Sequence, residues 1–85
     1  MIEKLRKEID RIDNNIIELL SKRKGAVKKI AGIKRQENTP VIDKGREQEI
    51  INRLKKLSKE NGLDENFIGS VYGIIIDNSR NEQER

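Results

Sequence analysis

The chain has 85 residues, a net charge of +4, 40% charged residues and 33% hydrophobic residues. It contains no Cys and no His, which excludes disulfides, metals bound by Cys or His, thiol nucleophiles and Ser-His-Asp triads. The sequence therefore predicts one small domain, residues 1–85, whose chemistry is carried by Lys, Arg, Asp, Glu, amide and hydroxyl groups.

Residues 2–36 are predicted to form one long helix. Their apolar side chains recur in steps of three, four and seven, which is the spacing of a helical heptad seam. A helix of this length spans ~50 Å, whereas a compact chain of this size has a diameter near ~30 Å. We therefore expect a second copy of the chain to cover the part of the helix that protrudes. The apolar seam positions are Leu5, Ile9, Ile12, Ile16, Leu19, Ala26, Ile30 and Ile33.

Two further helices are predicted, at about 43–60 and 64–83. Asp43 and Asp64 are suited to cap their starts, and Gly62 is suited to the left-handed conformation that ends a helix. The fold class is thus all-α, with three helices per chain and no strand pattern. The longest apolar run, residues 73–76, is far too short to span a membrane, and no signal sequence is evident, so we expect a cytoplasmic protein.

Several polar residues interrupt or flank the apolar faces. Arg23 occupies a seam position, where a cation needs an anion or a route to water. It either pairs with a nearby Glu or extends outward, or it binds an anionic ligand. The other residues of this kind are open to a plain surface or capping interpretation as well as a functional one; they are Arg6, Lys34, Arg46, Glu47, Ser79 and Gln83.

Five segments of the chain form a recognisable series in their order and spacing. They are residues 5–13 (LRKEIDRID), 16–23 (IIELLSKR), 27–34 (VKKIAGIK), 40–47 (PVIDKGRE) and 74–79 (IIIDNS) followed by Gln83. Together they resemble the all-helical class of chorismate mutases. That family converts chorismate to prephenate, toward phenylalanine and tyrosine, as an interlocked homodimer of three-helix chains, and the resemblance implies the same fold and activity here.

The resemblance also implies a role for each site residue. Arg23, and Arg6 from the partner chain, would hold the substrate carboxylates, with Arg46 adding positive charge. Lys34 and Gln83 would donate hydrogen bonds to the ether oxygen. Glu47 would accept one from the ring hydroxyl, helped by the backbone near Asp43, and Ser79 would lie near a carboxylate.

The implied reaction is consistent with the composition. A Claisen-type rearrangement needs no nucleophile, no metal and no net proton transfer, so we expect no cofactor. It requires a dianionic substrate held in a compact geometry and donors aimed at developing charge.

Two other functions remain open from the sequence: a helical interaction module without catalysis, or activity on related substrates such as isochorismate. Nucleic-acid binding is disfavoured because acids alternate with the basic residues and aromatic residues make up only 2% of the chain. Members of the family also occur fused to other enzymes of the pathway, but we expect a free-standing enzyme.

Overall fold

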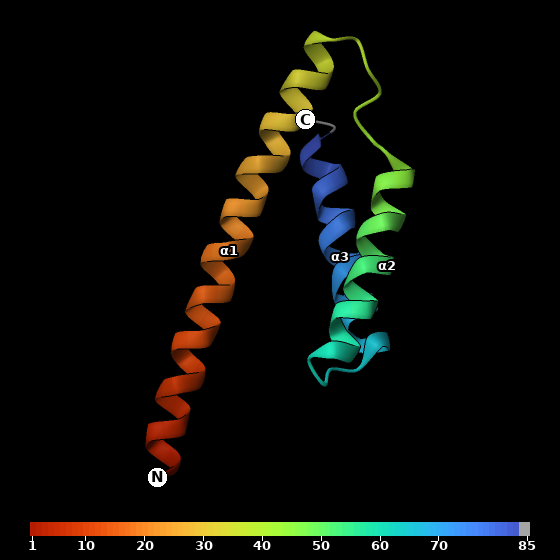
Figure 1. The fold of residues 1–85 in the computed structure, drawn as a ribbon. Helices are drawn as coiled ribbons and strands as arrows, with labels where there is room; N and C mark the ends of the chain where they lie inside the picture. The colour runs from red at the N-terminus through yellow and green to blue at the C-terminus, as the bar shows by residue number, and fades with distance from the viewer. Residues whose placement is uncertain (84–85) are drawn as a thin grey trace.

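Three helices make up the structure, a computed structural model that describes residues 1–83 (Figure 1). They are α1 (Ile2–Gln36), α2 (Lys44–Glu60) and α3 (Glu65–Gln83). Within the described residues there is no strand, so the predicted all-α class with a long first helix is confirmed. None of these helices is long and apolar enough to cross a membrane, as judged over residues 1–83.

The second and third helices each begin one residue later than predicted, because an aspartate caps them from outside. The Asp43 carboxylate accepts a hydrogen bond from the backbone N–H of Arg46 at 3.0 Å, and the Asp64 carboxylate accepts one from that of Asn66 at 2.9 Å. These bonds satisfy N–H groups that have no partner inside the helix.

The ends of α1 and α2 share one turn geometry. Asn38 and Gly62 follow them with φ of 55° and 69°. The next backbone N–H, of Thr39 or Leu63, then returns to a carbonyl in the last turn, at 2.9 Å and 2.8 Å respectively. This is the Schellman arrangement, which reverses the chain sharply. At the end of α2 this turn lays α3 alongside α2. At the end of α1 it returns the 37–43 loop toward the last turn of that helix.

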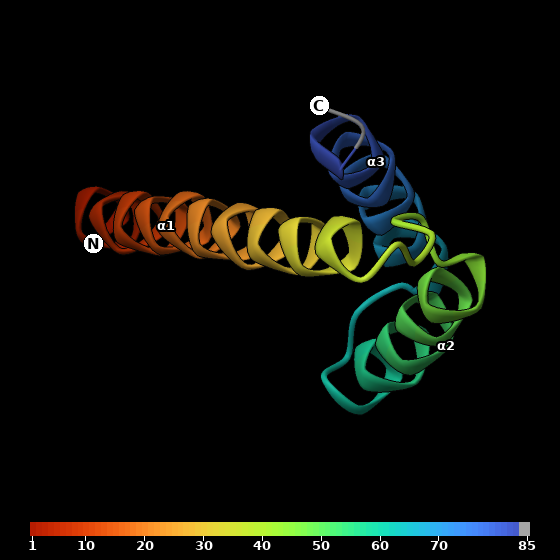
Figure 2. The same cartoon turned by 90° about the horizontal axis from the view of Figure 1, so that it is seen from above.

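Helix α3 holds the chain together. It packs against both α1 and α2, whereas the backbones of α1 and α2 do not come close to each other within the described residues. Figures 1 and 2 show α2 and α3 side by side, and they show the N-terminal half of α1 extending away from both. The molecule measures 55 × 23 × 16 Å, so its long dimension is set by α1.

The single chain has almost no hydrophobic core. Among the described residues only two apolar side chains, Ala31 and Ile76, are buried. Residues 1–22 are all exposed, and along the α1 seam Leu5, Ile9 and Ile12 keep 52%, 55% and 50% of their surface. The prediction that a second copy covers this seam stays a prediction.

Candidate active site

A pocket of about 190 Å³ lies where the three helices meet. Helix α1 contributes Arg23 and Lys34, which are three helical turns apart and therefore on one face. Helix α3 contributes Ser79 and Gln83, one turn apart. The start of α2 supplies the remaining polar lining residues, which are Asp43, Arg46 and Glu47. Seven of the eight predicted site residues thus share one pocket.

The Arg23 side chain crosses from α1 to α3. Its Nη1 donates to Ser79 Oγ at 2.6 Å, and that hydroxyl donates to the Ile75 carbonyl at 2.9 Å. Both side chains are partly buried. The guanidinium of Arg23 therefore neither pairs with a nearby Glu nor extends into water, which were the two structural alternatives for an arginine in the seam. The Ser79 hydroxyl is a neutral partner, so the guanidinium keeps its full charge for an anion at the pocket.

Lys34 lines the pocket close to the turn that follows α1. Its Nζ lies 3.4 Å from the Val41 carbonyl oxygen, a long contact that leaves donor capacity on the ammonium. Asp43 follows two residues later and uses its carboxylate to cap α2. The sharp turn at Asn38 is what lets these two residues face the same space.

The Glu47 carboxylate forms an ion pair with a residue that the sequence analysis did not select. Arg80 of α3 donates from Nε to Glu47 Oε2 at 2.8 Å and from Nη2 to Oε1 at 2.5 Å. The Glu47 side chain is only 16% exposed. The hydrogen bonds from Arg80 lower the pKa of Glu47 below its usual range, against the opposing effect of burial. Glu47 is therefore a carboxylate, and an acceptor only, at neutral pH.

Arg46 and Gln83 each contact other parts of the chain as well as lining the pocket. The Arg46 side chain is 59% exposed and forms an ion pair with Glu49 at 3.4 Å. The Gln83 backbone carbonyl accepts a hydrogen bond from the Arg35 guanidinium, which attaches the end of α3 to α1. Both residues line the pocket, and both are within reach of a bound ligand.

Arg6 is the one predicted site residue that the structure leaves outside the pocket. It lies on the exposed first turns of α1 and pairs with Glu3 at 3.1 Å. Arg6 and Arg23 are separated by ~25 Å along the helix. Arg6 therefore cannot act on the pocket of its own chain, and its predicted role in a partner's site stays a prediction.

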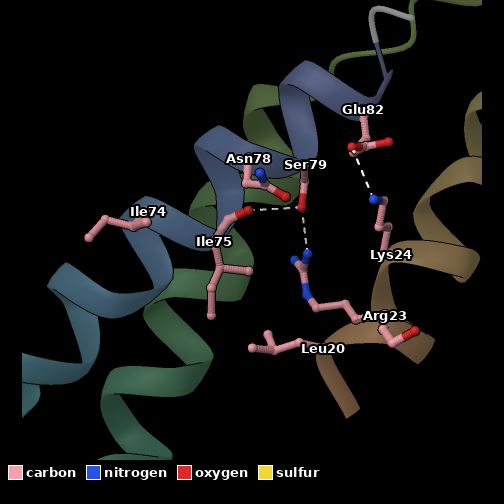
Figure 3. Close-up of a pocket in the computed structure, with 9 residues that line it drawn as sticks. Leu20, Arg23, Lys24, Ile74, Ile75, Asn78, Ser79 and Glu82 are labelled. Carbon is pink, nitrogen blue, oxygen red and sulfur yellow. Dashed lines mark hydrogen bonds and ion pairs between the residues drawn. The ribbon is translucent and has the colours of Figure 1, made fainter. Parts of the chain in front are cut away.

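A larger hollow of about 500 Å³ adjoins the pocket between α1 and α3. Arg23 and Ser79 line both spaces and form the wall between them. Figure 3 shows the Arg23–Ser79 bond, with Leu20, Ile74 and Ile75 forming an apolar side of this hollow. The hollow lies on the side from which the uncovered half of α1 extends.

Glu82 is a second residue that the sequence analysis missed. It is buried, and its carboxylate meets Lys24 at 3.4 Å (Figure 3). The same carboxylate also meets Lys28 at 3.6 Å. It fastens the last turn of α3, which carries Ser79 and Gln83, onto α1. The spacing of Lys24 and Lys28 is a helical i, i+4 pair, but nothing local links it to a glutamate on another helix.

Comparison with known proteins gives a consistent result. Residues 5–84 match the family model described as chorismate mutase type II. The chain is 42% identical over 83 residues to a chorismate mutase of Methanocaldococcus jannaschii, covering 94% of this chain and 84% of that protein.

Two other relatives have different names. One is a bifunctional chorismate mutase/prephenate dehydratase of Buchnera aphidicola, 42% identical over 87% of this chain, which spans 19% of that protein. The other is a 4-amino-4-deoxychorismate mutase of Streptomyces venezuelae, 28% identical over 88% of this chain and 73% of that protein. The match of one family model to nearly the whole chain, with a relative of similar length at 42% identity, shows that this protein belongs to the chorismate mutase type II family.

Proposed function

We propose that the pocket between the three helices is the active site of a chorismate mutase, in which chorismate rearranges to prephenate. The observation that carries this proposal is the meeting of Arg23, Lys34 and Glu47 in one small pocket. They come from positions far apart in the sequence, on two helices whose backbones are not packed against each other within the described residues. Membership of the family supports the activity independently of the geometry.

The charges of the pocket suit a dianionic substrate. Three cationic side chains, Arg23, Lys34 and Arg46, line it together with the two carboxylates Asp43 and Glu47. Because Arg80 compensates Glu47 from outside the pocket, the field at the centre is positive. Such a field favours two carboxylates over a neutral molecule of the same shape.

The mechanism requires positioning and electrostatic stabilisation. Arg23 and Arg46 bind carboxylates and hold the enolpyruvyl side chain over the ring, so that the carbons that will bond are in contact. As the ether C–O bond lengthens, negative charge grows on its oxygen. Lys34 and Gln83 donate hydrogen bonds to that oxygen, and preorganised donors of this kind lower the barrier. No covalent intermediate and no cofactor takes part.

The other polar residues orient the substrate. Glu47 accepts a hydrogen bond from the ring hydroxyl, aided by the backbone near Asp43. Ser79 lies beside a bound carboxylate, since its hydroxyl already meets the Arg23 guanidinium. Even a millionfold acceleration requires ~8 kcal/mol, which a few charge-assisted contacts are able to supply.

We further propose that two copies interlock and that each supplies Arg6 to the other's site. The uncovered apolar seam of α1 supports this, because its half-exposed Leu and Ile side chains have no cover in the single chain. The seam from Leu5 to Arg23 has its midpoint at Asn14. A second α1 related by a two-fold axis there would run antiparallel and bring its Arg6 near Arg23. The larger hollow is then the space that the partner helix fills.

The match of the family model to residues 5–84 also supports a single domain over residues 1–85. The bifunctional relatives join a chorismate mutase to a prephenate dehydratase. That pairing supports a role for this protein in the synthesis of phenylalanine and tyrosine, with prephenate passed to a further enzyme.

The direct test is to follow the loss of chorismate absorbance with purified protein and to identify prephenate as the product. Isochorismate and 4-amino-4-deoxychorismate are assayed in parallel, since one relative is named for the latter. A clear preference for either one in kcat/KM would reassign the substrate. No turnover of any of the three by a folded protein would favour a non-catalytic helical module instead.

A further inference from the structure

The side chains of Glu47 and Arg80 form a two-pronged ion pair between α2 and α3. Two different guanidinium nitrogens of Arg80 donate to the two carboxylate oxygens of Glu47, at 2.8 Å and 2.5 Å. This is the fork geometry that fixes a carboxylate in orientation as well as in charge. Arg80 directly follows Ser79 in α3, and successive residues of a helix face different directions. Ser79 therefore meets α1 while Arg80 meets α2.

Arg80 approaches Glu47 from the side away from the 190 Å³ pocket. Glu47 lines the 190 Å³ pocket and also a neighbouring hollow of about 330 Å³. Among the described residues Arg80 lines only the second of these spaces. Glu47 is thus a wall between the two, held on its outer face by Arg80.

The geometry leaves Glu47 able to bind a donor in the pocket. A carboxylate has about four lone-pair positions, two on each oxygen, and the fork uses one on each. We propose that Arg80 is a positioning residue for Glu47, which holds the carboxylate from behind so that its remaining lone pairs accept from the substrate's ring hydroxyl. The role of Glu47 toward the substrate rests on the proposed function, whereas the ion pair between Arg80 and Glu47 is independent of it.

Other charges surround Glu47 and bear on its titration. Lys34 and Arg23 approach from α1, Asp43, Lys44 and Arg46 lie at the start of α2, and Asp77 lies on α3. Arg80 has the largest effect among the residues that change the pKa of Glu47, and Lys44 acts in the same direction while Asp43 opposes it. Removal of Arg80 alone is therefore expected to raise the pKa of Glu47 toward its usual range.

The experiment compares Arg80→Gln, Arg80→Lys, Glu47→Gln and the double variant Arg80→Gln/Glu47→Gln. Arg80→Gln should lower kcat/KM by about tenfold, the scale of one charge-assisted contact, and should move the acid limb of the pH profile upward. Arg80→Lys should recover part of the loss, since it restores the charge without the fork. The double variant should be no worse than Glu47→Gln, because Arg80 acts through Glu47. Arg53→Gln, which removes an exposed arginine of α2, is the matched control and should match the parent.

Two results would overturn the proposal. One is an Arg80→Gln variant with parent kcat/KM and an unshifted acid limb; the other is a double variant whose losses simply add. Circular dichroism of each variant separates either result from unfolding. If the parent protein rearranges no chorismate, the proposed function fails, and an NMR titration of the Glu47 carboxyl then tests the pairing. An unchanged Glu47 pKa in Arg80→Gln would refute the pairing as well.

Discussion

The guanidinium of Arg23 donates to the hydroxyl of Ser79 at 2.6 Å, and this bond joins α1 to α3 at the wall between the pocket and the larger hollow. It explains how an arginine occupies the apolar seam of α1 without a carboxylate beside it. The bond orients the guanidinium while leaving its charge unneutralised, which is what a site for an anionic ligand requires.

Replacement of Arg23 tests this directly. Arg23→Ala should lower kcat/KM at least about a hundredfold, the scale observed when a preorganised donor to developing charge is removed. Ser79→Ala should cost much less, because it removes the orienting partner and keeps the cation. Steady-state kinetics on chorismate measure both, with Arg53→Ala on the exposed face of α2 as the control. An Arg23→Ala variant with parent activity would remove this residue from the site.

The pH profile tests the assignment of Gln83. An amide donates a hydrogen bond at any pH, and Glu47 stays ionised because its pKa is lowered by Arg80. Activity should therefore be nearly flat from about pH 6 to pH 8 and should fall only toward acid, as Glu47 takes up a proton.

A Gln83→Glu variant provides the contrast for that profile. A carboxyl group donates only when protonated, so its activity should decline as the pH rises through neutrality. Initial rates across the range check both proteins. A steep loss above pH 7 in the parent would contradict a neutral donor at residue 83.

Mixing two inactive variants tests the shared site. Lys34→Ala should lose at least about a hundredfold in kcat/KM, and Arg6→Ala should also be impaired if its side chain serves a partner. Each mixed pair would contain one site that has lost both residues and one that has lost neither. After subunit exchange, the mixture should regain activity that neither variant has alone. No recovery, with exchange verified by mass spectrometry, would mean that Arg6 and Lys34 do not meet across two chains.

The apolar seam of α1 predicts how stability depends on association. Ile12 is 50% exposed in the single chain, and a surface substitution of this kind usually changes stability by less than ~0.5 kcal/mol. If a second copy covers the seam, Ile12→Lys instead places two charges in an interface and should abolish the pair. Leu63→Lys, at a residue with the same 50% exposure, is the control.

Sedimentation and thermal unfolding at several protein concentrations measure that effect. The parent should unfold at a lower temperature when diluted, because dissociation accompanies unfolding. A parent Tm independent of concentration, with Ile12→Lys as stable as Leu63→Lys, would show that the chain folds alone.

Much of the fold follows from local features that a sequence displays. The heptad spacing in residues 2–36, the capping aspartates 43 and 64, and the turn at Gly62 each act over a few residues. Such features therefore predicted all three helices to within one residue. The family resemblance supplied the site residues, because order and spacing along the chain carry it.

Tertiary structure decided which side chains meet across helices. Arg80 and Glu47 are 33 residues apart and Glu82 is far from Lys24 and Lys28, so no local spacing links them. Each of these residues alone is an ordinary charge on a helix in a chain that is 40% charged. Their pairing depends on the rotation and axial position of α3 relative to α1 and α2. The packing of the whole chain determines that geometry, and no short-range pattern encodes it.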